Sequence, residues 1–379
     1  MSIKIRVLHI GKFYPVYGGV EKVMYDFCDG LSRRGIQSDF LGVNADAKTT
    51  RIVKVNHYFT VYAMSYIRKV ASTYLSTTMI RQLRKIKHRY DIVHIHHPDP
   101  MACLALWLSG FKGKVVCHWH SDIVRQQTLL RLYKPLQTWM LKRASLIAGT
   151  SPVYLQCSPY LQPFKDKCVL VPIGIPPVGK LLNHNTLRKI QTMSNGRKIV
   201  FSLGRLIYYK GYQYLIESAG YLTEDICVII GGKGPLQEEF EASIVQLGLS
   251  DKVFLVGRIE EEDLSSYFSV CDLFCLPSTE RSEAFGIVQV EAMAYGKPLV
   301  ATRIEGSGVS WVNEENVSGL NCEVENAKDL ADKINTILGN TALVQQFGAG
   351  ALKRYEDHFT QEKMVERMIP LYEKILDKK

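Results

Sequence analysis

The stretch that decides the fold reads STERSEAFGIVQVEAMAYGKP and spans residues 278–298. A short apolar run, Leu273–Leu276, comes before it, and a second one, Leu299–Ala301, comes after it. Apolar runs of this length predict buried strands, and the mostly apolar segment from about Phe285 onward predicts a helix between them. A strand, a helix and a second strand form the repeating unit of a parallel sheet.

The same alternation of short apolar runs and longer helical patterns extends along the whole chain. Helices are predicted, for example, over Val20–Arg34 and Met101–Ser109. The strands fall into two series separated by a polar stretch rich in proline and glycine near Ile173–Asn195. This organisation predicts an α/β protein with two parallel, doubly wound sheets. The predicted strands are Arg6–Ile10, Ser38–Val43, Ile92–His96, Val115–His118, Leu146–Gly149, Val169–Val171, Ile199–Leu203, Cys227–Gly231, Val253–Val256, Leu273–Leu276 and Leu299–Ala301.

The length also favours two domains, because a chain of 379 residues, 46% of them hydrophobic, exceeds the usual size of one core. We expect an N-terminal Rossmann-like domain over 1–180, a linker over 181–196 and a C-terminal Rossmann-like domain over 197–359. Residues 360–379 predict a terminal helix that could cross back to the N-terminal domain. Two such domains would face a cleft at the carboxyl ends of their strands, where open α/β sheets bind ligands.

Cysteine usage and hydropathy narrow the class of protein. The nine cysteines include no C-x-x-C pair, so free buried thiols in a reducing cytosol are expected rather than disulfides or a zinc site. No run of about 18 apolar residues predicts a membrane span. The N-terminal run Lys4–Ile10 resembles a first strand more than a signal peptide. These features predict a cytoplasmic protein.

Positive charge is concentrated in the first half of the chain. Of the net charge of +10, residues 1–195 carry +19 and residues 196–379 carry −9. The densest part is a basic run from Arg81 to Arg89, interleaved with apolar residues at helical spacing. Two interpretations stay open: a solvated helix on the domain surface, or peripheral contact with the anionic inner face of a membrane. No RNA-binding strand motif accompanies the charge, so a nucleic-acid partner is not expected.

Glycine-rich turns follow several of the predicted strands. Gly18-Gly19 opens the first helix, and Gly231–Gly234 follows a buried strand of the second series. Such turns let backbone N–H groups approach a diphosphate closely. Neither G-x-G-x-x-G nor G-x-x-x-x-G-K-[ST] occurs, so the fingerprints of dehydrogenases and P-loop NTPases are absent.

Two cations follow the first strand of the second series. Arg205 follows that strand after a single glycine, Gly204, and Lys210 precedes Gly211. Such a pair could neutralise a departing diphosphate, although two ordinary surface cations would look the same in the sequence.

Two glutamates lie on either side of the predicted helix start at Phe285–Gly286. Glu283 lies in the loop before the helix, and Glu291 lies within it. A carboxylate in a mostly apolar helix is costly unless it has partners, so a binding role is favoured over a solvated side chain. The unpaired N–H groups at the helix start could bind a phosphate, while Glu291 reaches ribose hydroxyls and Glu283 reaches a sugar.

The segment from Glu283 to Pro298 resembles the E-x7-E region of the retaining glycosyltransferases of family 4, which have the GT-B fold. The resemblance covers nearly the whole chain, because Gly18-Gly19 resembles the family's glycine loop and Arg205 with Lys210 resembles its diphosphate-binding pair. It implies a nucleotide diphosphate sugar as donor and a glycan or lipid-linked glycan as acceptor. The residues that it assigns to donor binding are Gly18, Gly19, Arg205, Lys210, Gly232, Arg258, Ile259, Glu283, Ala284, Phe285, Gly286, Ile287 and Glu291.

A histidine follows the fourth predicted strand of the first series, in the run HWHSD of residues 118–122. An isolated histidine at a strand end is usually structural, but the resemblance places His120 with Ser121 against the transferred sugar. His118 lies on the strand itself and is expected to pack. The run to Arg125 also resembles bacterial mannosyltransferases of surface-polysaccharide assembly, such as O-antigen synthesis. This resemblance makes GDP-mannose the expected donor and a UDP-hexose the alternative.

No D-x-D pair occurs in the sequence, so neither a metal nor a cofactor is expected. Arg205, Lys210 and the helix-start amides would stabilise the leaving diphosphate, while His120 and Glu283 would orient the sugar. In retaining enzymes of this resemblance the acceptor hydroxyl attacks from the side of the leaving group, and the diphosphate can take its proton. A nucleotide-sugar epimerase on the same fold stays open as an alternative. The sequence carries no signal for an oligomeric state.

Overall fold

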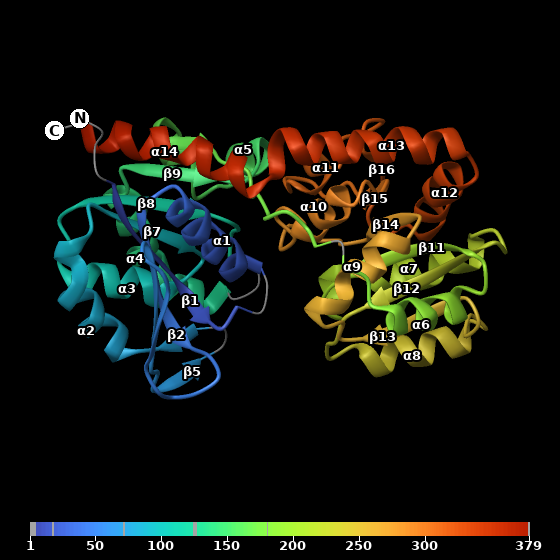
Figure 1. Cartoon of the computed structure of the whole chain (residues 1–379), viewed down its shortest axis with the longest axis horizontal. Helices are drawn as coiled ribbons and strands as arrows, with labels where there is room; N and C mark the ends of the chain where they lie inside the picture. The colour runs from blue at the N-terminus through green and yellow to red at the C-terminus, as the bar shows by residue number, and fades with distance from the viewer. Residues whose placement is uncertain (1–4, 17–18, 71–72, 124–126, 180, 378–379) are drawn as a thin grey trace. The chain divides into compact units, whose positions relative to one another are not determined.

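A computed structural model describes residues 5–16, 19–70, 73–123, 127–179 and 181–377. The chain forms two compact units (Figure 1). The first consists of Met1–Pro176 together with Thr360–Lys379, and the second of Pro177–Phe359. The C-terminal segment therefore belongs to the unit that contains the N-terminus.

The first unit is built on an eight-stranded sheet in which every pairing is parallel except that of β3 with β4. The strand order reverses between β1 and β7, as in a doubly wound sheet. Across the sheet the strands are β10 (Cys168–Leu170), β9 (Leu146–Gly149), β8 (Lys114–Trp119), β7 (Ile92–His97), β1 (Arg6–Tyr14), β2 (Gln37–Asn44), β4 (Phe59–Met64) and β3 (Arg51–Asn56). A separate hairpin pairs β5 (Arg68–Val70) with β6 (Thr73–Leu75).

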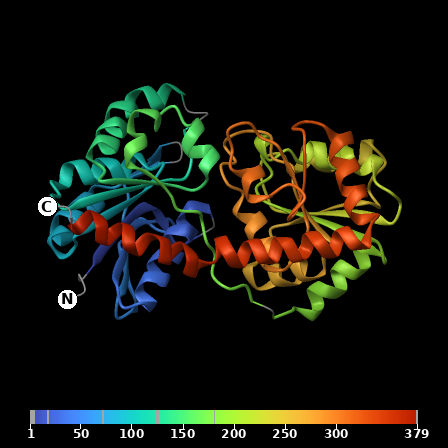
Figure 2. The ribbon, with the colours of Figure 1, turned by 90° about the horizontal axis from the view of Figure 1, so that it is seen from above.

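The helices of the first unit include one from the far end of the sequence. Helix α14 packs along α1, where the Gln361 side chain donates to the Asp26 carbonyl at 2.7 Å, and Figure 2 shows α14 at the red end of the colour scale. The helices are α1 (Gly19–Arg33), α2 (Thr77–Ile86), α3 (Pro100–Ser109), α4 (Gln127–Arg143), α5 (Pro152–Cys157) and α14 (Gln361–Asp377), with short 3-10 turns at Lys87–Arg89 and Gln162–Lys167.

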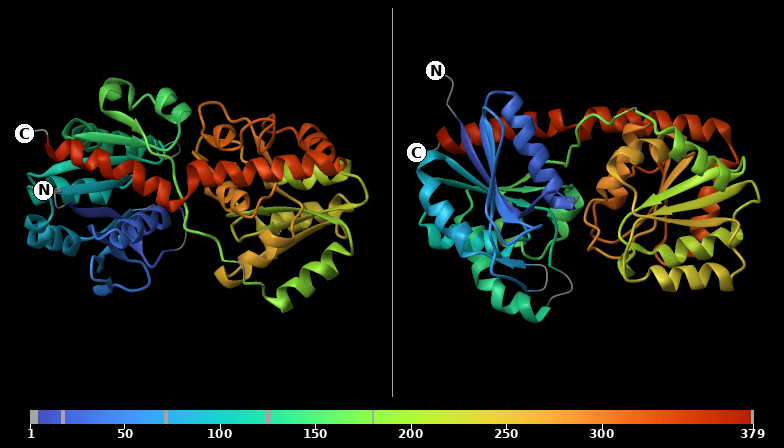
Figure 3. Two further views of the ribbon diagram at one scale, coloured as in Figure 1. Left: turned by 45° about the horizontal axis from the view of Figure 1, so that its top comes forward. Right: turned by 60° about the horizontal axis from the view of Figure 1, so that its bottom comes forward.

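The second unit has a six-stranded, fully parallel sheet whose order reverses between β11 and β14. Its central strands are buried on both faces, as in Val228, Ile229 and Ile230, which are at most 1% exposed. Such strands need helices on both sides, and Figure 3 shows these layers. The strands are β13 (Val253–Gly257), β12 (Ile226–Gly231), β11 (Lys198–Leu203), β14 (Leu273–Leu276), β15 (Leu299–Thr302) and β16 (Gly319–Cys322).

Two groups of helices cover the sheet of the second unit. Apolar residues of α7, α8 and α12 form one core with the strands, whereas Phe268 of α9 packs against Phe201 and Phe274. The helices are α6 (His184–Ser194), α7 (Tyr212–Ser218), α8 (Gln237–Gln246), α9 (Glu261–Val270), α10 (Ile287–Ala294), α11 (Val309–Val312), α12 (Ala327–Leu338) and α13 (Thr341–Arg354). Short helical turns lie at η3 (Tyr208–Lys210), η4 (Ala219–Tyr221) and η5 (Tyr355–Phe359). None of the described helices is long and apolar enough to cross a bilayer.

The prediction of a linker over 181–196 is wrong. Most of this segment is helix α6, which begins after Asn183 and packs against α9. Ile190 of α6 is 2% exposed, and the Thr186 hydroxyl donates to Asp263 at 2.7 Å. The helix buries only a narrow stripe of its surface, so most of its residues are polar. Its composition is therefore similar to that of a linker. The chain passes between the units at Pro176–Pro177 instead.

Candidate active site

The charged residues predicted in the second unit meet where its strand order reverses. Lys210 ends η3 after β11, and Glu283 lies in the loop after β14. Lys210 Nζ lies 2.5 Å from Glu283 Oε2, and both side chains are 12% exposed. The Ser278 hydroxyl donates a further hydrogen bond to the same carboxylate oxygen at 3.1 Å. Open α/β sheets bind ligands at this point.

The environment of Lys210 keeps it positively charged. Burial lowers the pKa of Lys210, but the charge of Glu283 and the hydrogen bond to it outweigh that effect, so the pKa is raised above its ordinary value. The ammonium group is therefore fixed and charged at neutral pH. A fixed cation in a largely desolvated position is suited to stabilise negative charge that develops on a bound group.

Glycines bring the strand-end loops of this unit close together. Gly232 has a φ of +140°, and a Cβ there would lie 1.8 Å from the Gly204 carbonyl oxygen. Its own N–H donates to the Gly257 carbonyl at 2.7 Å. The loops after β11, β12 and β13 thus approach one another at a distance that only glycine permits.

Helix α10 begins at the predicted place. Gly286 is its N-cap with a φ of +74°, and among the described residues no side chain caps this helix start. The Gln289 side chain donates to the Phe285 carbonyl at 3.3 Å, and the Ala284 carbonyl accepts from Gly308 N–H at 2.9 Å. These hydrogen bonds fix the carbonyl groups of the loop before α10. The amides of the first helical turn, at the positive end of the helix dipole, can therefore bind an anion.

The remaining residues predicted for the donor occupy different environments. Glu291 is half-buried on α10, and Arg205 is exposed directly after Gly204. Ile259 packs over the end of β12, since a Cβ on Gly231 would lie 2.5 Å from Ile259 Cδ1. Arg258 is exposed in an ion pair with Glu260 at 3.2 Å. Arg258 and Ile259 line a hollow of about 640 Å³ bounded by α6, β13 and α9, which does not include Lys210 or Glu283.

In the first unit, His120 directly follows β8 and is 4% exposed. Its Nε2 lies 3.0 Å from Nδ1 of His96, and its ring stacks on that of His118 with centroids 4.4 Å apart. Desolvation lowers the pKa of His120 well below its ordinary value, and the neighbouring His118 lowers it further. The ring is neutral at pH 7, so it can orient a ligand by hydrogen bonding. His118 is fully buried. His120 is therefore not isolated at this strand end, because two other histidines contact its ring.

Sequence reasoning missed a polar group at the same edge of the first sheet. Glu21 of α1 and Asp99, the N-cap of α3, are 7% and 2% exposed. Burial raises the pKa of both carboxyl groups, and the charge of Lys12 partly offsets this. In the sequence, Lys12 and Glu21 flank the pair Gly18-Gly19. Charged residues on both sides of a glycine pair were the signal that could have pointed to this group. Gly18 lies outside the described residues, and Gly19 opens α1 with a φ of +63°.

Comparison with known proteins identifies the chain. A family model described as Glycosyltransferase Family 4 matches residues 17–177, and one described as Glycosyl transferases group 1 matches residues 183–354. The O-antigen chain mannosyltransferase C of Escherichia coli is 32% identical over 382 residues, covering 99% of this chain and 100% of the relative. The chain is a family 4 glycosyltransferase. The D-rhamnosyltransferase WbpZ of Pseudomonas aeruginosa is 30% identical to this glycosyltransferase and covers 94% of it, with 92% of WbpZ aligned.

Solved structures share the fold of this glycosyltransferase along its whole length. Sucrose-phosphate synthase from Thermosynechococcus elongatus matches with a TM-score of 0.80 and 19% identity, covering 99% of this chain and 100% of the other. Anabaena Alr3699/HepE, solved with UDP, matches with a TM-score of 0.78 and 20% identity, covering 98% and 100%. These matches and the two doubly wound sheets confirm the predicted GT-B fold.

The two glutamates of this glycosyltransferase are expected to differ in their effects. Glu291→Ala should weaken the binding of GDP by roughly ten- to a hundredfold, because its expected partner is the ribose and a hydrogen bond to a charged group contributes about 1.5–3 kcal/mol. Glu283→Ala should chiefly lower turnover. Titration calorimetry measures the first effect, with Glu238→Ala on α8 as a matched helix control. Equal GDP affinity in wild type and Glu291→Ala would reject the ribose assignment.

Proposed function

We propose that this glycosyltransferase transfers mannose from GDP-mannose, with retention at the anomeric carbon, to a lipid-linked or polysaccharide acceptor in bacterial surface-polysaccharide synthesis. It would do so without a metal or cofactor and while bound peripherally to the cytoplasmic face of an anionic membrane. The observation that carries the proposal is the Lys210–Glu283 pair at the reversal of strand order in the sheet that also contains the open start of α10. The similarity to an O-antigen chain mannosyltransferase supports the choice of sugar.

The proposed chemistry uses positive groups of the chain at the leaving group. As the bond from the anomeric carbon to the diphosphate breaks, positive charge develops on the sugar and negative charge on the diphosphate. Lys210, Arg205 and the α10 amides would stabilise the diphosphate. The acceptor hydroxyl would attack from the same face and give its proton to a diphosphate oxygen, so that the new glycosidic bond keeps the anomeric configuration.

A thermal-shift panel of GDP, UDP, ADP and their sugars tests the donor. GDP-mannose is expected to raise the Tm most, since a ligand at about 100 times its Kd stabilises by about 2.7 kcal/mol. A larger shift with a UDP-hexose, or with a rhamnosyl donor as the name of WbpZ suggests, would replace the donor assignment. Conversion of the donor without an acceptor would indicate an epimerase instead.

NMR of the transferred sugar's anomeric proton tests retention.

The proposed membrane contact is formed by exposed residues of α2 and α3, here called the α2–α3 patch (Arg81, Lys85, Trp107 and Leu108). Arg81 and Lys85 are exposed on α2, and Trp107 and Leu108 on α3 are 54% and 36% exposed. Exposed cations on one helix and an exposed tryptophan on the helix packed against it suit the interface of an anionic bilayer. Arg84 and Lys87 are not included in the patch because they have a structural role. Their side chains donate hydrogen bonds to the carbonyls of Leu108 and Ser109, at 3.0 and 2.6 Å respectively.

Reversing Arg81 and Lys85 to glutamate is expected to abolish co-sedimentation with anionic vesicles while activity on a short soluble acceptor persists. Each basic side chain near such a surface contributes about 1 kcal/mol, and the attraction is screened by salt. Arg51 and Lys54, both exposed on β3, provide a control reversal with the same change of net charge. Wild-type binding that is independent of salt, or absent with anionic vesicles, would contradict the proposed contact.

A further inference from the structure

Five histidines lie on one face of the sheet of the first unit, on three adjacent strands. They are His9 on β1, His94 and His96 on β7, and His118 on β8 with His120 directly after it. None is more than 4% exposed. Phe27 of α1 packs against the rings of the first four, and Tyr372 of α14 hydrogen-bonds to His94 Nδ1 at 2.6 Å. These two helices cover the histidine layer.

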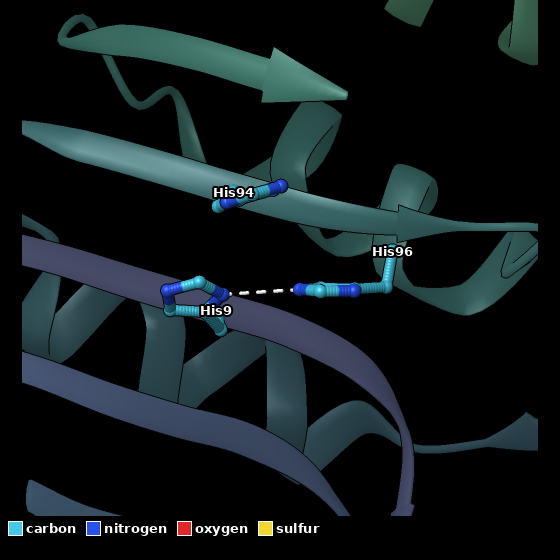
Figure 4. Close-up of side chains that lie close together, drawn as sticks. All are labelled: His9, His94 and His96. Atoms are coloured by element: carbon cyan, nitrogen blue, oxygen red, sulfur yellow. Dashed lines mark hydrogen bonds between the residues drawn. The ribbon is translucent and has the colours of Figure 1, made fainter. Parts of the chain in front are cut away.

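Three of these rings form a hydrogen-bonded chain, here called the histidine chain (His9, His96 and His120). His9 Nδ1 lies 3.0 Å from His96 Nε2, as Figure 4 shows. His96 Nδ1 lies 3.0 Å from His120 Nε2. Both nitrogens of His96 are therefore engaged, and the chain leads from the middle of β1 to the carboxyl end of β8.

The three rings of the histidine chain are neutral. Desolvation lowers the pKa of His9 to about 3, and it lowers the pKa of His96 and of His120 well below the ordinary value. A neutral imidazole has one N–H and one lone pair. Because each hydrogen bond needs one of each, the tautomers of the three rings are coupled, and only two arrangements satisfy both bonds.

The two arrangements differ at the ends of the chain, where His9 Nε2 and His120 Nδ1 have no hydrogen-bond partner among the described residues. In one, His9 donates to His96, His96 donates to His120, and His120 carries its hydrogen on Nδ1. In the other, all donors reverse and His9 is left with a permanently buried N–H. Each arrangement leaves one N–H without a partner among the described residues, and a buried N–H without an acceptor is unfavourable. His9 is 0% exposed in the middle of its strand, whereas His120 keeps 4% exposure at the carboxyl end of β8, where a ligand oxygen can accept the hydrogen. The first arrangement is therefore favoured.

We propose that His9 and His96 are positioning residues that hold His120 as its Nδ1–H tautomer, ready to donate to an oxygen of the bound sugar. A ligand oxygen at this strand end satisfies the last N–H of the histidine chain. This inference rests on the proposed contact between His120 and the sugar. It extends that role to two residues that do not touch the substrate.

The same side chains resemble a metal site only in composition. Ligand atoms of His9, His94 and His96, and of His96, His118 and His120, lie within 4.8 Å of one another. However, the rings of His94 and His96 in the first group are stacked at 18° to each other, and those of His118 and His120 in the second group at 7°. Lone pairs in the planes of parallel rings run side by side, whereas a tetrahedral metal needs them to converge.

NMR of the full-length protein labelled with 15N-histidine tests the proposal, because protonated and unprotonated ring nitrogens resonate far apart. The wild-type protein is expected to show His120 protonated at Nδ1 and not at Nε2, with His96 also protonated at Nδ1. A His120 ring protonated at Nε2, or a mixture of tautomers, would overturn it. Stoichiometric metal found by elemental analysis would also overturn it, because a metal would occupy the His96 lone pair.

Variants on β7 connect the tautomer to activity. His96→Leu removes the donor to His120, so both His120 tautomers should appear, and transfer should fall about tenfold while GDP affinity is unchanged. His94→Leu is the matched control, since it lies on the same strand and face but outside the histidine chain, and it should keep the wild-type tautomer. A His96→Leu protein with an unchanged tautomer and rate refutes the positioning role. A locked tautomer together with full activity of His120→Ala would instead refute the sugar contact while the histidine chain stands.

Discussion

Replacing Lys210 with alanine is expected to lower the turnover number by about two orders of magnitude, the scale on which loss of one charge-stabilising donor acts. The ammonium group is held 2.5 Å from Glu283 and is charged at neutral pH, so the active site loses a fixed cation. Arg205→Ala should lower turnover similarly. Steady-state kinetics with GDP-mannose and an acceptor measure both effects, and activity should persist in EDTA.

The Lys210 variant needs a control for stability, because it leaves the mostly buried Glu283 carboxylate without its ion pair. The double variant Lys210→Met with Glu283→Gln removes both charges and should recover thermal stability without recovering turnover. Arg303→Ala, an exposed cation after β15 that pairs with Glu323 at 2.8 Å, should have near wild-type activity. Complete loss of wild-type activity in EDTA with rescue by manganese would refute the metal-free mechanism.

Replacing His120 with alanine is expected to abolish most sugar transfer, roughly a hundredfold, and to leave GDP binding unchanged. The neutral ring is proposed to contact the transferred sugar. His120 belongs to the first unit, whereas the residues proposed to bind the diphosphate belong to the second. Kinetics and titration calorimetry on the same preparation separate the two effects.

His118→Ala is the matched control for the His120 variant. Its ring is fully buried and stacks on His120, so truncation should cost on the order of 3 kcal/mol of unfolding free energy through the cavity it leaves. It should affect transfer less than His120→Ala does. Near-normal turnover of His120→Ala would show that His120 has only a structural role.

Much of the fold could be predicted from local pattern alone. Strands buried on both faces appear as continuous apolar runs, and all the predicted strands occur, including Leu273–Leu276 as β14. The start of α10 was also encoded locally, because glycine at position 286 adopts the left-handed conformation that ends the loop. Other elements were missed: α6 looked like a linker, and the edge strand β3 is mostly exposed. The strands β4 and β16 were not predicted either, although both are mostly buried.

The sequence by itself determined the fold class and the positions of the glycine-rich strand ends and helix starts that form the candidate active site, since these follow from residues close together in the chain. Only the tertiary structure decided the pairing of Lys210 with Glu283, which are 73 residues apart. It alone also decided that His9, His96 and His120 form one chain. Period-two spacing places His94 with His96, and His118 with His120, on one face of a strand. Which strands become neighbours depends on the order of the whole sheet, and that order is set by long-range packing rather than by local sequence.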